Sequence, residues 1–333
     1  MRDCWTEVMT GLLRRGRQTL LTVGVVTVMT GCLLDVSVAQ TDERPVADAD
    51  APPVDPFAAF TDERLRAAVQ KACERVEARD EPLTLQSLQK LRHLDIRGQK
   101  IGSLAGLEQC QGLTQLRAAN NQIVDLGPLV GCPRLSLLDV SGNRVSNLSP
   151  LRQASQLRVL LLDGNQVEDL QPLAGCGELQ MLRAPGNRIT DVSACRSLSK
   201  LHALLVADNQ ITQLVLPATM AALTTVDVSG NQVTDISELT MTPRLNWLFL
   251  SGNNIEEVAP LLQAVQARLT AAQQATWSGT VRLDDNPLTD AARGQLEQLR
   301  TLGATVTDRV PEVKSEDSEQ SAESDTDESK SGE

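Results

Sequence analysis

Apolar residues recur along most of this chain with a period of 22 residues. Each unit has the form L-x-x-L-x-L-x-x-N-x-I-x-x-L-x-x-L, and eight units follow one another without insertion or deletion. Their first residues are Leu91, Leu113, Leu135, Leu157, Leu179, Leu201, Leu223 and Leu245. Self-similarity at a fixed period of this length indicates an array of stacked structural units.

The apolar positions within a unit predict its local structure. The fourth and sixth positions, Leu138 and Val140 in the third unit, alternate with other residues as in a half-buried strand. Because equivalent residues return one unit later, successive strands should lie parallel and about 4.8 Å apart. We therefore expect an α/β solenoid with a parallel sheet on its concave face, short 3₁₀ or turn segments on its convex face, and helical caps at both ends.

Two polar or special positions support this arrangement. The ninth position is asparagine in seven units and Gln99 in the first; a stacked column of amides can satisfy backbone groups where the chain leaves the strands. The asparagines are Asn121, Asn143, Asn165, Asn187, Asn209, Asn231 and Asn253. Proline at the sixteenth position suits the first turn of a 3₁₀ segment, and it occurs as Pro128, Pro150, Pro172 and Pro260.

The repeat resembles that of the bacterial leucine-rich repeat proteins of the internalin class. The motif N-x-[IV]-x-D-[LIV] is present as NQIVDL, NRITDV and NQVTDI, with the variants NRVSNL and NQVEDL, and residues 57–309 carry the resemblance. The resemblance implies a curved solenoid that binds other proteins, and it brings no shared catalytic residues. Fold alone does not identify the partner.

The amino end predicts export. Residues 1–39 contain Arg14, Arg15 and Arg17, then an apolar run too short for a membrane span, then small residues. Two processing routes compete: cleavage after Ala39 would give a soluble protein, and lipidation at Cys32 within Met29-Thr30-Gly31-Cys32 would tether the chain to a membrane. The remaining alternative is an uncleaved anchor. The protein is therefore expected in the periplasm, in the cell envelope or secreted.

The segments next to the repeats predict a linker and a helical cap. Residues 40–56 are rich in Asp, Ala and Pro and should form a disordered linker. Within a cap spanning residues 57–90, a helix is expected over Thr61–Arg79, with Thr61 as its N-cap. Its buried face should carry Leu65, Val69, Ala72 and Val76 and cover the open end of the solenoid.

The carboxyl end breaks the period. The eight repeats are assigned to residues 91–266, and residues 267–310 to an expansion helix, a ninth partial repeat and a cap. The helical spacing runs over Leu261–Thr276, a strand pattern resumes at Val281, and a second helix is expected over Asp290–Leu302. Residues 311–333 form a Ser, Asp and Glu tail that should be disordered.

Charge is concentrated at the ends of the chain. The net charge is -12, but residues 42–55 hold one basic and five acidic residues, and residues 312–333 hold two basic and nine acidic residues. The repeat region is therefore nearly neutral, with no basic stripe that would follow a phosphate backbone. We expect no nucleic-acid binding.

The reactive residue types favour a protein without catalytic function. Cys110, Cys132 and Cys176 occupy the twentieth position of their units and should be buried thiols like Cys195, although a Cys110–Cys132 disulfide is an open alternative. The histidines, His93 and His202, lie five units apart without motif partners. No enzyme activity, cofactor or metal is expected, and the protein should act as a monomer.

Side chains at the third and fifth positions of each unit should point outward from the concave sheet. Several are apolar and should expose apolar area, and charged residues lie between them. A mixture of this kind is typical of the core of a protein interface. The predicted partner-binding residues are Arg117, Leu137, Asp139, Val159, Leu161, Met181, Arg183, Leu205, Asp227, Trp247 and Phe249. Two alternatives are that these side chains cover one another or pack on the expansion helix.

Two functional hypotheses follow. The first is an exported recognition module that binds a protein or peptide on its concave face. The second is a structural envelope lipoprotein, tethered through its amino terminus, without a discrete ligand.

Overall fold

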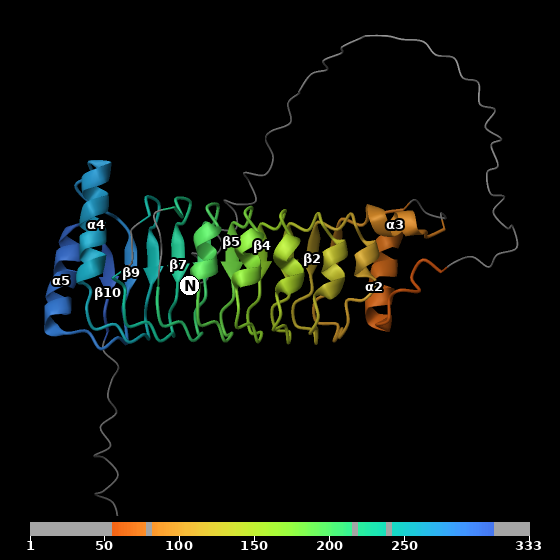
Figure 1. The fold of residues 1–333 in the computed structure, drawn as a ribbon, viewed down its shortest axis with the longest axis horizontal. Helices are drawn as coiled ribbons and strands as arrows, with labels where there is room; N and C mark the ends of the chain where they lie inside the picture. Colours follow the sequence, from red (N-terminus) through yellow and green to blue (C-terminus); the bar gives the residue numbers. More distant parts are fainter. Residues whose placement is uncertain (1–54, 78–81, 215–218, 238–241, 310–333) are drawn as a thin grey trace, which may run out of the picture. The chain divides into compact units, whose positions relative to one another are not determined.

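The computed structural model describes residues 55–77, 82–214, 219–237 and 242–309. The chain divides into residues 1–53 and residues 54–333, and all described residues belong to the second unit. In that unit, ten strands form one parallel sheet in the order β1 to β10 (Figure 1). The strands are β1 His93–Asp95, β2 Gln115–Arg117, β3 Leu137–Asp139, β4 Val159–Leu161, β5 Met181–Arg183, β6 Ala203–Leu205, β7 Thr225–Asp227, β8 Trp247–Phe249, β9 Thr280–Arg282 and β10 Thr305–Thr307.

The strands confirm the period of the sequence. Strands β1 to β8 each cover the third to fifth positions of one unit, and every unit pairs in register with the next. In β3, the central Leu138 is fully buried and lies between Leu116 and Leu160 of the adjacent strands. Burying one leucine of this kind contributes about 1.5 to 3 kcal/mol, so the stacked leucines form a continuous core along the solenoid.

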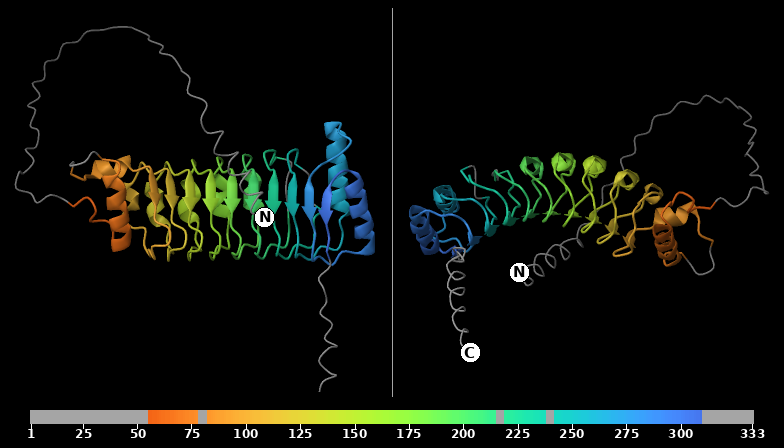
Figure 2. Two further views of the ribbon diagram at one scale, coloured as in Figure 1. Left: turned by 180° about the vertical axis from the view of Figure 1, so that it is seen from behind. Right: turned by 90° about the horizontal axis from the view of Figure 1, so that it is seen from below.

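The convex face consists largely of short 3₁₀ segments, as predicted. Figure 2 shows them on the outer side of the curved row of units, with the strands on the inner side. These segments are η2 Leu107–Gln109, η3 Gly127–Gly131, η4 Ser149–Gln153, η5 Gln171–Gly175 and η6 Ser193–Ser197. Proline lies in the first turn of η3, η4 and η5, where its missing N–H costs nothing.

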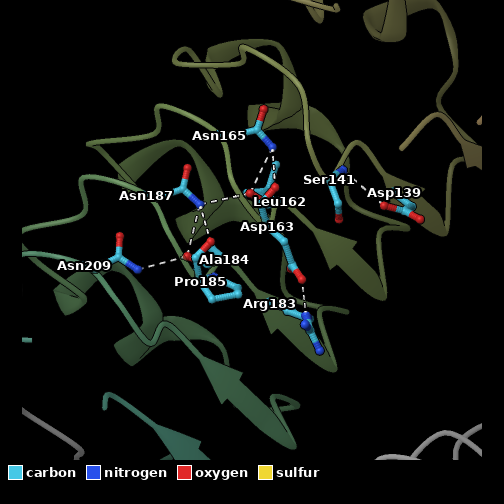
Figure 3. Close-up of polar contacts among 10 residues, drawn as sticks. All are labelled: Asp139, Ser141, Leu162, Asp163, Asn165, Arg183, Ala184, Pro185, Asn187 and Asn209. Carbon is cyan, nitrogen blue, oxygen red and sulfur yellow. Dashed lines mark hydrogen bonds and ion pairs between the residues drawn. The ribbon is translucent and has the colours of Figure 1, made fainter. Parts of the chain in front are cut away.

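The asparagine column forms as the sequence predicts, and each amide joins two units. Asn165 Nδ2 donates to the carbonyl oxygens of Val140 (3.0 Å) in the preceding unit and Leu162 (2.9 Å) in its own unit, and Asn165 Oδ1 accepts from Val145 N (2.9 Å). Figure 3 shows Asn165, Asn187 and Asn209 in successive layers of this column. Asn286 extends the column into the ninth unit, where it donates to Leu250 O (2.9 Å).

The turn after each strand needs a left-handed backbone at the eighth position of the unit. This position has φ between 54° and 67° in all eight units. Glycine occupies it in six units, and Asn120 and Asp208 occupy it in the other two. Glycine, asparagine and aspartate are the residues that adopt this conformation most readily, so the repeated S-G-N and D-G-N sequences are explained by turn geometry.

The amino end is capped by two helices, α2 Glu63–Glu74 and α3 Leu85–Lys90. The predicted N-cap was wrong by one residue: the carboxylate of Asp62, rather than Thr61, accepts hydrogen bonds from Arg64 N (2.9 Å) and Leu65 N (3.1 Å). The same carboxylate accepts from Gly102 N (2.9 Å), which ties the cap to the first repeat.

The buried face of α2 also differs from the prediction at its carboxyl end. Leu65 and Val69 are buried as expected, but Cys73 follows them, and Val76 is 47% exposed. The helix ends at Glu74, so Val76 leaves the helical spacing that would have turned it inward. Helix α3 was not anticipated, because its six residues are too few for a periodic signal.

The carboxyl end is closed by two helices and two strands. Helix α4 covers Ala259–Ala272, with Pro260 in its first turn, so this proline begins an α-helix rather than the predicted 3₁₀ segment. Helix α5 covers Asp290–Thr301, and Thr289 caps it through a hydrogen bond from Ala292 N (3.1 Å). The sequence analysis did not predict β10, although the β-branched run Thr305-Val306-Thr307 was a usable signal.

The cysteines of the described segments, Cys73, Cys110, Cys132, Cys176 and Cys195, are free and buried, which favours the buried-thiol interpretation over the Cys110–Cys132 disulfide. Cys132 Sγ donates to Leu107 O (3.2 Å), and Cys176 Sγ donates to Leu151 O (3.4 Å). Burial raises the pKa of the Cys73 thiol to about 11 and those of Cys132 and Cys195 to about 12, so these thiols stay protonated.

Several sequence-based predictions lie outside the described residues. They concern the export signal of residues 1–39 with Cys32, nearly all of the linker, and the acidic tail. In the parts of the chain that the structure describes, no helix has the length and apolar character required to cross a membrane.

Candidate partner-binding surface

The concave face is built from the outward-facing side chains of the strands. In each three-residue strand the middle residue is buried in the core, and side chains alternate along a strand, so the first and third residues face the other side of the sheet. Figure 2 shows that the strands lie on the inner side of the curve. The sheet thus presents two parallel columns of side chains, one from the third and one from the fifth position of each unit.

Most of the predicted partner-binding residues are accessible on this surface. Arg117 is exposed, and the others with accessible side chains are half-buried. The half-buried members are Leu137, Asp139, Val159, Leu161, Arg183, Asp227, Trp247 and Phe249.

Met181 and Leu205 differ from the prediction that they expose apolar area. Met181 is 1% exposed and Leu205 is 6% exposed. The register places Met181 between Val159 and Ala203, and Leu205 between Arg183 and Asp227. Neighbouring strands are only about 4.8 Å apart, so adjacent side chains, including the alkyl part of arginine, cover the residue between them.

An ion pair crosses the middle of the concave face. Arg183 Nε lies 2.5 Å from Asp163 Oδ2, and the two side chains are 32% and 27% exposed (Figure 3). Burial raises the pKa of the Asp163 carboxyl, Arg183 lowers it, and the nearby carboxylate of Asp139 raises it further. The net direction is upward, and Asp163 Oδ1 is buried without a hydrogen-bond partner. Arg183 is therefore the main group that favours the ionised form of Asp163.

The carboxyl end of the concave face carries its aromatic residues. The register places Trp247 between Thr225 and Thr280, and the Arg282 guanidinium lies 5.1 Å from the centre of the Phe249 ring. The sequence left open that these aromatic residues pack on the expansion helix. That helix, α4, instead continues the row of helical segments on the convex side (Figure 2), so both aromatic side chains keep accessible area.

A cluster of basic residues that was not predicted from the sequence lies at the amino end of this face. Arg64, Lys71 and Arg75 of the cap lie together with Arg117 of β2 around a cavity of about 940 Å³. Their spacing of seven and four residues placed the three cap residues on one helical face, which was a usable signal. The net charge of the whole region does not reveal this cluster, because acidic residues elsewhere in the region balance it.

The described residues include no group of three or more histidine, cysteine, aspartate or glutamate side chains placed to hold a metal ion. His93 is exposed at the amino end of the sheet, whereas His202 is half-buried and its Nδ1 has no hydrogen-bond partner. The two histidines lie on the first and sixth units, as their sequence positions indicated.

Comparisons with known proteins point to one group. The family model for leucine-rich repeats in two copies matches residues 111–153. Internalin C2 of Listeria monocytogenes is 30% identical, with a TM-score of 0.58, and the alignment covers 66% of this chain and 96% of that one. A comparison with curated protein sequences found no match.

Two further solved structures resemble the chain in fold alone. The functional domain of InlJ from Listeria monocytogenes is 24% identical with a TM-score of 0.54, covering 73% of this chain and 55% of that one. A leucine-rich repeat protein of Leptospira interrogans is 19% identical with a TM-score of 0.55, covering 67% of this chain and 62% of that one.

Proposed function

The chain belongs to the internalin-like class of bacterial leucine-rich repeat proteins, and we propose that it is an exported, non-catalytic recognition module that binds a protein or peptide on its concave face. The fold itself supports a protein–protein interaction module. The concave location, export and the absence of catalysis are parts of the proposal.

The observation that carries the proposal is the composition of the concave surface. Leu137, Val159 and Leu161 lie side by side on β3 and β4, half-buried and without a covering element among the described residues. Charged residues flank them, with Arg117 on one side and Arg183 on the other. Apolar area bounded by charge is typical of the core and rim of a protein interface.

The aromatic residues of β8 provide a second contact region. Trp247 and Phe249 are both half-buried, and Arg282 holds the Phe249 ring from the next strand. The part of the concave face between β4 and β8 includes Met181, Ala203 and Leu205, whose side chains are all buried. A partner would therefore make its main contacts at the two apolar regions, and Trp247 is the strongest candidate for an anchoring residue.

The remaining parts of the proposal come from the sequence. Residues 1–39 have the features of an export signal, so the protein should act in the periplasm, in the envelope or outside the cell. The presence of a membrane tether depends on which processing route is used, and mass spectrometry of the mature amino terminus distinguishes lipidation at Cys32 from cleavage after Ala39. No described contact favours a purely structural envelope role.

An affinity experiment tests the proposal. The full chain is immobilised and exposed to an envelope extract, in parallel with Trp247→Ala on the concave face and Gln171→Ala on the convex segment η5. We expect a protein that is retained by the parent and by Gln171→Ala but depleted with Trp247→Ala. The proposal is wrong if every retained protein binds Trp247→Ala as well as it binds the parent.

A further inference from the structure

A cavity of about 940 Å³ opens where α2 faces the first two strands. Its walls come from one side of α2 and from the outward-facing side chains of β1 and β2, so it is continuous with the concave face. Figure 2 shows α2 at the end of the sheet, beside β1. Six basic side chains line this cavity, which we call the cationic hollow: Arg64, Lys71, Arg75, Lys90, Arg92 and Arg117.

The hollow has few negative charges of its own. Asp95 is the single carboxylate in its lining, and this group is already paired with Arg97 at 2.7 Å. Lys90 is paired with Glu77 at 3.0 Å. Glu77 balances the charge of Lys90, and the single carboxylate of the lining, Asp95, is paired with Arg97. Most of the positive charge of the hollow is therefore not balanced by a nearby carboxylate.

The remaining basic side chains are held in place without being neutralised. Arg64 Nη1 donates to Lys100 O (3.1 Å), and Arg92 Nη1 donates to Gly112 O (2.9 Å). These acceptors are neutral carbonyl oxygens, so both guanidinium groups keep their charge. Within the described parts of the chain, Lys71, Arg75 and Arg117 are in no ion pair. Like charges gathered in one concave site attract an anionic ligand.

The rest of the lining suits a polypeptide rather than a nucleic acid. No phenylalanine, tyrosine or tryptophan lines the hollow, so the exposed His93 ring is the one aromatic surface on which an unpaired base could stack. Gln99 and Gln115 provide amide donors and acceptors that can bond to a peptide backbone, and Ala68 and Ala72 leave room beside α2.

We propose that the cationic hollow anchors an acidic segment, rich in aspartate or glutamate, of the protein that binds the concave face. Carboxylates of this segment would pair with Lys71, Arg75 and Arg117, while the body of the partner extends along the sheet toward β3 and β4. The inference rests on the proposed function, since it assigns the charge of the partner at one end of the same surface. Arginine is well suited to this role because its guanidinium binds a carboxylate through two hydrogen bonds.

The chain's own acidic tail is a less suitable occupant. The tail starts after β10, at the opposite end of the sheet from the hollow. Nine strand spacings separate β1 from β10, or about 43 Å. The described part of the chain therefore ends far from the hollow, at Arg309.

A fluorescence anisotropy titration tests the proposal with a defined probe. A fluorescein-labelled octa-glutamate peptide is titrated with the full chain, with the double variant Lys71→Glu and Arg75→Glu, and with Arg117→Glu. Arg152→Glu, an exposed arginine on the convex segment η4, is the matched control for charge reversal. All four substituted side chains are exposed, so denaturant midpoints should confirm that the variants fold.

We expect the parent to bind the peptide and to lose at least about tenfold in affinity between about 50 and 200 mM salt. The double variant and Arg117→Glu should each bind at least about tenfold more weakly than the parent, whereas Arg152→Glu should stay within about twofold. Absence of binding by the parent, or an equal loss with Arg152→Glu, would overturn the proposal.

Two further arms test two other occupants, a nucleic acid and the chain's own carboxyl-terminal tail. An oligothymidylate of the same charge should bind more weakly than the peptide, and equal or tighter binding would overturn the assignment to a protein segment. Deletion of residues 312–333 should leave the affinity for the peptide unchanged, and a marked gain would assign the hollow to the chain's own tail instead.

The proposed function and this inference fail in different ways. If the partner recovered with the parent still depends on Trp247 but binds the double variant normally, the concave face is the interface and the acidic anchor is wrong. If the peptide binds as expected but no partner depends on Trp247, the cationic hollow is a binding site for acidic segments, and the assignment of the wider concave face as the interface is wrong.

Discussion

At the scale of single residues, the asparagine column couples neighbouring units. Each amide in the column has hydrogen bonds to carbonyl oxygens of two successive units and accepts from an amide of the preceding unit. The amide side chain is buried, so water cannot replace a lost partner. The sequence predicted this role correctly because only a side chain with both donors and an acceptor can recur at that position.

Asn165→Leu should therefore destabilise the protein by about 1 to 3 kcal/mol. The substitution leaves Val145 N without its acceptor. It also removes one of the two amide donors of Val140 O and of Leu162 O, which keep Asn143 and Asn187 respectively, so it affects two units. Equilibrium denaturation with a fluorescence or circular dichroism readout measures the change. Coincident midpoints of variant and parent would mean that the asparagine only forms the turn.

Arg183→Ala should be destabilising in a pH-dependent way. Asp163 has a pKa raised by burial and by Asp139 and lowered by Arg183, so removing Arg183 raises it further. An ionised, partly buried Asp163 then costs about 1 to 3 kcal/mol at neutral pH. As the pH falls toward 3.8, the ordinary pKa of an aspartate, the Asp163 carboxyl becomes protonated both in the folded variant and in the folded parent. The difference in stability between variant and parent then disappears.

Denaturant midpoints of Arg183→Ala and the parent at neutral and acidic pH check this prediction. Arg188→Ala is the matched control, since Arg188 pairs with Glu168 at 3.7 Å and both side chains are more than half exposed. Its removal should change stability little at any pH. An Arg183→Ala effect that is constant with pH would contradict the role given to Asp163.

At the scale of elements, the strand-to-turn transition is set by one backbone conformation. The eighth position of each unit has a positive φ, and a side chain there is strained even where space is available. Gly164 has φ 60° and open space around the position of a Cβ atom, so strain is the main effect of adding a methyl group.

Gly164→Ala should thus cost about 1 kcal/mol, and Gly177→Ala should be close to neutral. Gly177 also has open space around it but no positive φ, which makes it a control for the loss of glycine itself. Thermal or denaturant unfolding of the two variants compares them directly. Equal effects would show that the left-handed backbone is not what selects glycine in these turns.

The elements at the two ends were predicted less well than the repeats. Inside the array, the same pattern occurs in eight successive units, so a deviation in one unit does not obscure it. At the ends, single contacts contribute: the Asp62 carboxylate, which caps α2 in place of Thr61, also accepts a hydrogen bond from Gly102 N in the first repeat. Contacts of this kind join residues far apart in sequence, and a single sequence contains no periodic signal for them.

At the scale of the whole molecule, the solenoid was predictable and the detail of its concave surface was only partly so. The sequence determined which side chains leave the sheet, but not how far their neighbours cover them. Met181 and Leu205 show the difference, since each points outward and is nevertheless buried between adjacent strands. The cationic hollow was missed because it forms only when α2 packs beside β1 and β2.

Removal of residues 312–333 should leave the melting temperature unchanged. This segment contains nine acidic residues and little apolar surface that could offset the entropy of ordering it. Differential scanning calorimetry of the full and shortened chains provides the comparison. A decrease of several degrees in the shortened chain would show that part of the tail packs on the folded unit.

The central claim is that the partner binds the concave face, and a calorimetric titration of the recovered partner tests it most directly. Trp247→Ala should weaken binding by more than about 2 kcal/mol, or roughly thirtyfold, because Trp247 is an accessible aromatic side chain on β8. Gln171→Ala, on the exposed convex side, should bind like the parent. The opposite result, with Trp247→Ala binding normally and Gln171→Ala failing, would contradict the account.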